Sequence, residues 1–127
     1  MKIIALDVHR SFAQMAILEN RTIRDAGKVD LKRSRLLHFA KTLKREDEVV
    51  LEATGNTSAI VRLLSPFVAR VVIANPNLVR AIASAKVKTD KIDARVLAKL
   101  HASGFLPEVW MPDEETETRR RITVERT

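Results

Sequence analysis

The sequence predicts an α/β domain with a mixed five-stranded sheet and helices on both of its faces. Three strand-like segments come first, and helix-like and strand-like segments then alternate. Early hairpins followed by β–α–β crossovers combine antiparallel and parallel pairs in one sheet, and the crossover helices cover its faces. At 127 residues and 46% hydrophobic content, the chain is most simply one domain with its own core.

The first part of the chain supplies the hairpin strands and one helix. Residues 2–8 are apolar on both faces, as a central strand requires. Residues 12–18 and the more polar residues 22–29 predict two further strands, and residues 20–21 suit a short turn between them. Apolar side chains recur at helical spacing within residues 31–44, which predicts a helix.

The next part of the chain alternates between strand and helix signals. Residues 48–53 predict a fourth strand that is again apolar on both faces. The turn at residues 54–57 leads into a helix, with Asn56 or Thr57 as its N-cap. Residues 70–74 predict the fifth strand.

Capping signals predict two more helices. Asn75 is a good N-cap and Pro76 suits a first helical position, so a short helix is expected to about residue 85. Thr89 or Asp90 is then expected to cap a last helix that reaches about residue 103, where a glycine follows.

Composition excludes several classes of protein. There is no cysteine, so the chain has no disulfide, thiolate metal site or cysteine nucleophile, and a cytoplasmic setting fits. No apolar run approaches the roughly 20 residues that span a bilayer. The N-terminus carries one lysine, a short apolar stretch and then Asp7, which is not a secretory signal.

The formal charge of +7 is unevenly placed along the chain. Basic side chains gather in residues 21–45 and 80–101, whereas residues 104–118 carry acids. Basic blocks suit a polyanion such as nucleic acid, and Lys88, Lys91 and Arg95 are candidate phosphate contacts. A solvated basic surface is the alternative interpretation.

Four carboxylates occupy positions where an acid is costly. Asp7 ends an apolar strand, Glu52 interrupts another, and Asp90 and Asp93 open the last predicted helix. On that helix Asp93 falls on the apolar side and Asp90 at its edge, while the basic side chains take the opposite side. An acid in an apolar setting must be paired, protonated or bound to a metal.

These positions favour a shared divalent cation. If the first and fourth strands are neighbours, Asp7 and Glu52 lie close together at adjacent strand ends, and Asp90 and Asp93 are neighbours on their helix. Mg²⁺ and Mn²⁺ prefer such oxygen ligands, and two ions about 4 Å apart can drive phosphodiester chemistry. Taken singly, the aspartates could be a turn acid, an N-cap and a first-turn acid. Glu52 is hardest to explain structurally.

Three segments carry a family resemblance. Residues 5–9 (ALDVH), 51–56 (LEATGN) and 88–95 (KTDKIDAR) resemble the DEDD transposases of the IS-one-ten family and the Piv/MooV-type DNA invertases. Residues 106–112 (LPEVWMP) look like the segment after the last acidic motif of that family. The resemblance covers nearly the whole chain, and the motif TDKIDAR is its most specific part.

The resemblance implies an RNase H-like fold of the RuvC type. It implies that Asp7, Glu52, Asp90 and Asp93 are the catalytic metal ligands, with Mg²⁺ or Mn²⁺ as the ion. It also implies DNA cleavage and strand transfer in transposition by a prokaryotic, nucleoid-associated protein. A homo-oligomeric assembly on DNA and an element-encoded guide RNA belong to the same implication.

Members of the family carry a second, C-terminal domain that bears a nucleophilic serine, and no segment of these 127 residues is expected to supply it. Residues 1–112 are therefore expected to form the catalytic domain, and residues 113–127 the start of a helical connector. Three alternatives stay open: a stand-alone Holliday-junction-resolvase-like nuclease, a non-catalytic nucleic-acid-binding remnant, and an actin-like ATPase half. The last ranks lowest, because no glycine-rich phosphate turn follows Asp7.

Overall fold

The computed structural model describes residues 1–55, 57–82 and 93–104. The predicted strands are confirmed, and helices follow them in the expected order. The elements are β1 Ile3–Val8, β2 Phe12–Glu19, β3 Thr22–Asp30, α1 Arg33–Ala40, β4 Glu48–Glu52, α2 Thr57–Leu64, the 3₁₀ turn η1 Ser65–Phe67, β5 Arg70–Ala74, α3 Pro76–Ile82 and α4 Ala94–Ser103. Within the described ranges, no helix has the length and apolar character needed to cross a bilayer.

The sheet has the strand order β3-β2-β1-β4-β5, and β2 alone runs against the other four. β1 lies between β2 and β4, with Ile4 opposite Ile17 on one side and Val49 on the other. This order, with one antiparallel strand beside the central one, is that of the RNase H-like fold, so the fold implied by the resemblance is confirmed. The strands that end in Asp7 and Glu52 are direct neighbours.

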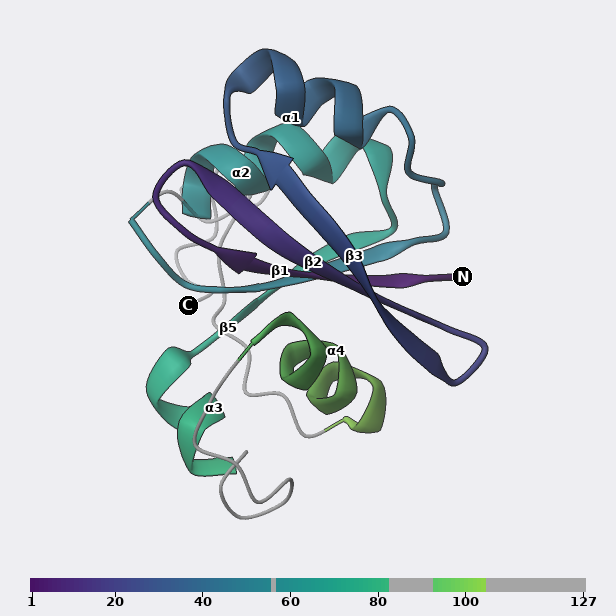
Figure 1. Ribbon diagram of the computed structural model, residues 1–127, viewed down its shortest axis with the longest axis vertical. Helices are drawn as coiled ribbons and strands as arrows, with labels where there is room; N and C mark the ends of the chain where they lie inside the picture. Colours follow the sequence, from purple (N-terminus) through teal and green to yellow (C-terminus); the bar gives the residue numbers. More distant parts are fainter. Residues whose placement is uncertain (56, 83–92, 105–127) are drawn as a thin grey trace, which may run out of the picture.

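Helices cover both faces of the sheet, as Figure 1 shows, with α1 and α2 on one side and α3 and α4 on the other. Successive side chains of a strand point to opposite faces, so β1 and β4 contribute to two cores. Ile4, Leu6, Val49 and Leu51 pack under α1 and α2. The other core, beneath α3 and α4, contains Ile3, Ala5, Val50, Val79, Leu97 and Leu100.

Two tight turns join β1 to β2 and β2 to β3, and a backbone hydrogen bond holds the end of β3 against the first of them. Asn20 and Arg21 both have positive φ values, 53° and 65°, which is the conformation that a two-residue hairpin loop prefers. In the β1–β2 turn, the N–H of His9 donates to the carbonyl of Phe12 at 2.8 Å. The N–H of Leu31 donates to the carbonyl of Ser11 at 3.0 Å, which ties the exit of β3 to that turn.

The predictions for α1 and α3 have different outcomes. α1 is shorter than predicted and ends at Ala40, because Thr42 and Leu43 donate their N–H groups three residues back instead of four. Asn75 is the N-cap of α3, as expected, and its Oδ1 accepts from the N–H groups of Asn77 and Leu78 at 3.0 and 3.1 Å. The predicted end of this helix lies outside the described residues.

The predicted start of the last helix is wrong. Asp93 is not within the helix but has an extended backbone, with φ −126° and ψ −176°, and α4 begins at Ala94. The reason is local, because the carboxylate of Asp93 accepts the N–H of Val96 at 3.1 Å and so satisfies a free donor of the first turn. Gly104 ends α4 in the left-handed conformation, as predicted. Thr89 and Asp90 lie outside the described residues.

Candidate metal centre at the ends of β1 and β4

The parallel strands β1 and β4 bring two acids to the same end of the sheet, and we call this end, with Asp7 and Glu52, the acid edge. Leu6 lies opposite Leu51 in the register, and Asp7 and Glu52 follow them by one residue each. Both acids continue the alternation of Ala5 and Val50, whose side chains belong to the core under α3 and α4. The predicted approach of the first two acids is therefore confirmed, and both face the α3–α4 layer.

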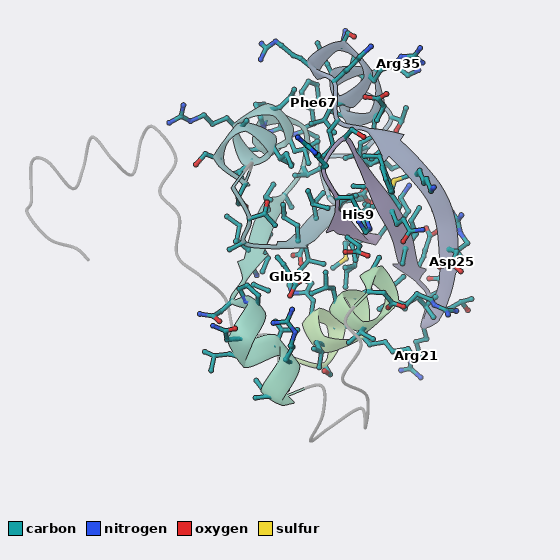
Figure 2. All side chains as sticks on the ribbon, turned by 60° about the vertical axis from the view of Figure 1, so that its left-hand side comes forward. His9, Arg21, Asp25, Arg35, Glu52 and Phe67 are labelled. Atoms are coloured by element: carbon teal, nitrogen blue, oxygen red, sulfur yellow. The ribbon has the colours of Figure 1, made fainter. Side chains whose placement is uncertain are left out.

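The carboxylate of Glu52 is the most unusual group at this edge. Its Oε2 atom is buried and has no hydrogen-bond partner among the described residues. Burial raises the pKa of Glu52, the nearby guanidinium of Arg80 lowers that pKa, and the neighbouring carboxylate of Asp7 raises it again. Figure 2 shows Glu52 on the side of the sheet that α3 and α4 cover. Since buried acceptors are nearly always paired, this oxygen calls for a proton, a water or a metal ion.

A short series of contacts orients Asp7. Its Oδ2 atom lies 3.3 Å from Nε2 of His9, in the turn that follows β1. The ring of His9 stacks on that of Phe12, with a centroid separation of 4.7 Å, and Nζ of Lys28 lies 4.6 Å from the centroid of Phe12. His9 is thus an exposed turn histidine that also contacts Asp7.

The third acid enters from the α3–α4 layer but does not complete a cluster. Asp93 is half-buried at the start of α4, whose Ala94 and Leu97 pack on the sheet face that carries Asp7 and Glu52. Within residues 1–55, 57–82 and 93–104, no three histidine or carboxylate side chains converge closely enough to hold one metal ion. Asp90 lies outside those ranges, so the four-acid centre stays a prediction.

The predicted nucleic-acid contacts are represented in the structure by Arg95. Its Nε atom lies 3.7 Å from Oδ1 of Asp25 on β3, and both side chains are exposed. Exposed ion pairs of this kind contribute little to stability, so phosphate can compete for the guanidinium at low cost. Lys88 and Lys91 lie outside the described residues.

The turn after Glu52 has a clear structural role. Thr57 is buried, and its Oγ1 accepts the N–H of Thr54 at 2.6 Å and donates to the carbonyl of Thr54 at 2.8 Å. These bonds close the turn at the start of α2, in agreement with the helix start predicted there.

Sequence reasoning missed Arg80. The residue belongs to α3, the helix that directly follows β5, and β5 ends beside Glu52 in the register that pairs Glu52 with Ala74. The sequence offered no signal for it, because Arg80 is one of many basic side chains in residues 80–101. Its relation to Glu52 arises from the β5–α3 crossover and could have been found by following that connection to the sheet edge.

The fold and its edge acids define a class, an RNase H-like domain with carboxylates at the ends of its two central parallel strands. The family comparison makes this specific. A family model described as transposase, for the DEDD transposases of the IS-one-ten type, matches residues 4–127. The chain therefore belongs to the DEDD transposase family.

Individual proteins are similar to this chain to different extents. A protein of Sinorhizobium fredii, y4qE, whose name groups it with transposases, is 28% identical over 130 residues, which cover 98% of this chain and 33% of the relative. The chain thus spans about a third of that relative's length.

Two solved structures also share part of the arrangement. RuvC of T. thermophilus in complex with a Holliday junction substrate is 12% identical, with a TM-score of 0.46 over 86% of this chain and 99% of RuvC. Pelota of Archaeoglobus fulgidus is 11% identical, with a TM-score of 0.47 over 80% of this chain and 31% of Pelota. Both scores are low, so the fold assignment rests on the strand order and register described above.

Proposed function

We propose that this chain is the metal-dependent catalytic domain of a DNA transposase, which cleaves and transfers DNA strands. Membership of the DEDD transposase family over residues 4–127 supports the class of reaction. The single structural observation that carries the proposal is the buried Oε2 of Glu52, which has no hydrogen-bond partner among the described residues and lies beside a second carboxylate, Asp7.

The donor set fits a hard divalent cation. Carboxylate oxygens are the ligands that Mg²⁺ and Mn²⁺ prefer, and a cation would satisfy the orphaned oxygen and remove the repulsion between Glu52 and Asp7. Asp7 and Glu52 would hold the ion, with Asp93 and Asp90 as further proposed ligands. When bound, divalent ions supply activation of a water or hydroxyl and stabilisation of the leaving oxygen of a phosphodiester.

The chain's own side chains then have distinct tasks. His9 holds one oxygen of Asp7 and so fixes the direction in which that carboxylate points. Arg80 is a cation beside Glu52 that can attract a phosphate to the acid edge. Arg95, with Lys88 and Lys91, is proposed to contact the DNA backbone, which positions a strand without reading its sequence.

The proposal extends to partners of the longer protein. DNA is the substrate, an element-encoded guide RNA is a second polyanion that the basic surface could hold, and the full-length protein acts as a homo-oligomer. Because this chain spans about a third of its relative y4qE, complete strand exchange is proposed for the longer protein and not for this part alone.

The test is metal-dependent thermal stabilisation of this chain. Millimolar Mg²⁺ or Mn²⁺ at about ten times its dissociation constant should stabilise the wild type by roughly 1.4 kcal/mol, because the ion binds the folded state. Asp7→Asn and Glu52→Gln should each abolish most of this shift. The melting temperature is followed by circular dichroism as metal is titrated into chelator-treated protein.

A matched control separates the site from general screening of charge. Glu19→Gln removes an exposed carboxylate from the opposite end of the sheet and should leave the metal shift intact. If the wild type shows no shift, or if Glu52→Gln shifts as much as the wild type, the proposed metal centre is wrong and the non-catalytic alternative is favoured.

A further inference from the structure

A cavity of about 420 Å³ lies on the opposite face of the sheet from Asp7 and Glu52. The β1–β2 turn, the end of β3, the start of α1 and α2 line it. Buried or half-buried aliphatic side chains form its floor, namely Leu36, Ile60 and Leu63. Exposed cationic side chains stand at its mouth, namely Arg10, Lys32 and Arg33.

The positive charge at this mouth is largely uncompensated. The carboxylate of Asp30 also lines the cavity, but its Oδ1 accepts the backbone N–H of Lys32 at 2.7 Å. Among the ion pairs of the described residues, none involves Arg10, Lys32 or Arg33. The cavity therefore combines an apolar interior with three cations that form no ion pair with the residues that the structure describes.

One turn connects this cavity to the acid edge. His9 contacts Asp7, while the next two residues, Arg10 and Ser11, line the cavity. The hydrogen bond from Leu31 to the carbonyl of Ser11 fastens the start of the α1 segment to the same turn. A ligand at the cavity mouth would thus lie next to the strand end that carries the proposed metal ligands.

We propose that this cavity takes one unpaired nucleotide of a DNA single strand whose adjacent backbone lies along the acid edge. The base would pack on the floor formed by Leu36, Ile60 and Leu63, and the phosphate would bind Arg10 and Arg33. A volume of about 420 Å³ is within the range of small-ligand pockets, and guanidinium groups match phosphate oxygens in bidentate geometry.

The apolar floor and the cationic mouth together favour a nucleotide as the occupant of this cavity. An acidic peptide or free phosphate would use the cations and leave the apolar floor exposed, and an apolar peptide would leave the cations unused. The inference rests on the proposed function for its choice of DNA, and it deepens that function by assigning an unpaired strand as substrate. Its test is run in chelator, so that it fails or succeeds independently of the metal centre.

The experiment measures the affinity of this chain for a fluorescein-labelled DNA single strand of about eight nucleotides, a usual site size for small domains. Fluorescence anisotropy is recorded over a range of salt concentrations. Arg10→Ala and Arg33→Ala should each weaken binding roughly five- to tenfold and reduce the slope of log affinity against log salt by about 0.7. Ala59→Phe, which narrows the cavity from the exposed face of α2, should weaken binding to a similar extent with the slope unchanged.

Arg24→Ala is the matched control for charge. Arg24 is an exposed arginine near the start of β3, at the far end of the strand from the cavity, and it should weaken binding less than twofold. Equal losses for Arg24→Ala and Arg10→Ala would show diffuse attraction and overturn the proposal, as would an unaltered affinity for Ala59→Phe.

Further outcomes also decide the matter. No binding by the wild type in chelator, or a tenfold preference for RNA of the same sequence, would overturn the assignment to single-stranded DNA. A large drop in melting temperature for Ala59→Phe would show that protein already fills the cavity, with the same consequence. If these variants behave as expected while the metal shift is absent, the proposed metal centre fails and the nucleotide site stands.

Discussion

Strand β4 begins and ends with a glutamate, and the two carboxylates differ in their hydrogen-bond partners. Glu48 and Glu52 are four residues apart on one strand, so both face the α3–α4 layer. Oε1 of Glu48 lies 2.6 Å from Nε2 of His101 near the end of α4, whereas Oε2 of Glu52 is buried and has no hydrogen-bond partner among the described residues. The same residue type, strand and face thus give one satisfied acid and one unsatisfied acid.

The acid next to Glu48 is satisfied even more completely. Asp47 is 1% exposed, its Oδ1 accepts the N–H of Lys2 at 3.1 Å, and its Oδ2 accepts the N–H of Lys44 at 2.9 Å. The ammonium group of Lys2 adds a contact at 3.9 Å. Acids at the start of β4 therefore have partners within the fold, whereas Oε2 of Glu52 at the end of the same strand has none among the described residues.

Asp47→Ala should produce the largest loss of stability in this comparison. The change leaves two backbone N–H groups, just before β1 and before β4, without the acceptor that the buried side chain of Asp47 supplies. We expect a decrease of about 3 kcal/mol in the free energy of unfolding, measured by urea denaturation in chelator.

Asp47→Asn is the control for that prediction. It keeps the size of the side chain and one acceptor oxygen, so it should lose less stability than the alanine variant. A loss below about 1 kcal/mol for Asp47→Ala would contradict the view that this acid is structural.

Glu48→Gln and Glu52→Gln form a matched pair of variants whose effects on the free energy of unfolding should be smaller than that of Asp47→Ala. The first weakens a charge-assisted contact with His101, whose side chain is 10% exposed, and should cost about 1 kcal/mol in the free energy of unfolding. The second removes a charge that has no hydrogen-bonded partner at Oε2, so stability in chelator at pH 7 should be unchanged or raised by less than about 1 kcal/mol. Equal losses in the two variants would contradict the comparison.

The pH dependence of the Glu52 variant gives a signed test. Because the pKa of Glu52 is raised above its ordinary value of 4.5, the folded wild type binds this proton more tightly than the unfolded chain does. The wild type should therefore lose stability relative to Glu52→Gln as the pH rises from 4.5 through the raised pKa, and the difference should level off above it. Urea denaturation at a series of pH values measures this difference, and parallel curves for the two proteins would exclude it.

The sequence predicted the parts of the molecule that depend on local pattern. Alternation and apolar runs identified the strands, and the positions of Asp7 and Glu52 pointed to the acid edge before β1 and β4 were known to be neighbours. Asp93 was identified as a site candidate but placed inside a helix, because apolar periodicity does not show that its side chain caps the first turn.

Other parts of the molecule depend on contacts between segments that are distant in the sequence, and the hydrophobic periodicity of a single sequence does not predict such contacts. Glu48 and His101 are 53 residues apart, and Lys2 and Asp47 are 45 apart. Asp47 looks like a loop acid in the sequence, yet it is among the most buried side chains in the described structure. Periodicity therefore identified the acid edge, whereas the satisfied acids at the other end of β4 needed the tertiary structure.

Arg80→Ala should have the smallest effect on stability and still sharpen the comparison. The side chain is exposed, so the free energy of unfolding should change by less than about 0.5 kcal/mol. Because the guanidinium lowers the pKa of Glu52, its removal should raise that pKa further, and Arg80→Lys should restore much of the original value. Carbon NMR of the Glu52 carboxyl group, titrated in chelator, measures the change. An unaltered titration in Arg80→Ala would show that burial and Asp7 alone set the charge of Glu52, and Arg80 would then have no part in the acid edge.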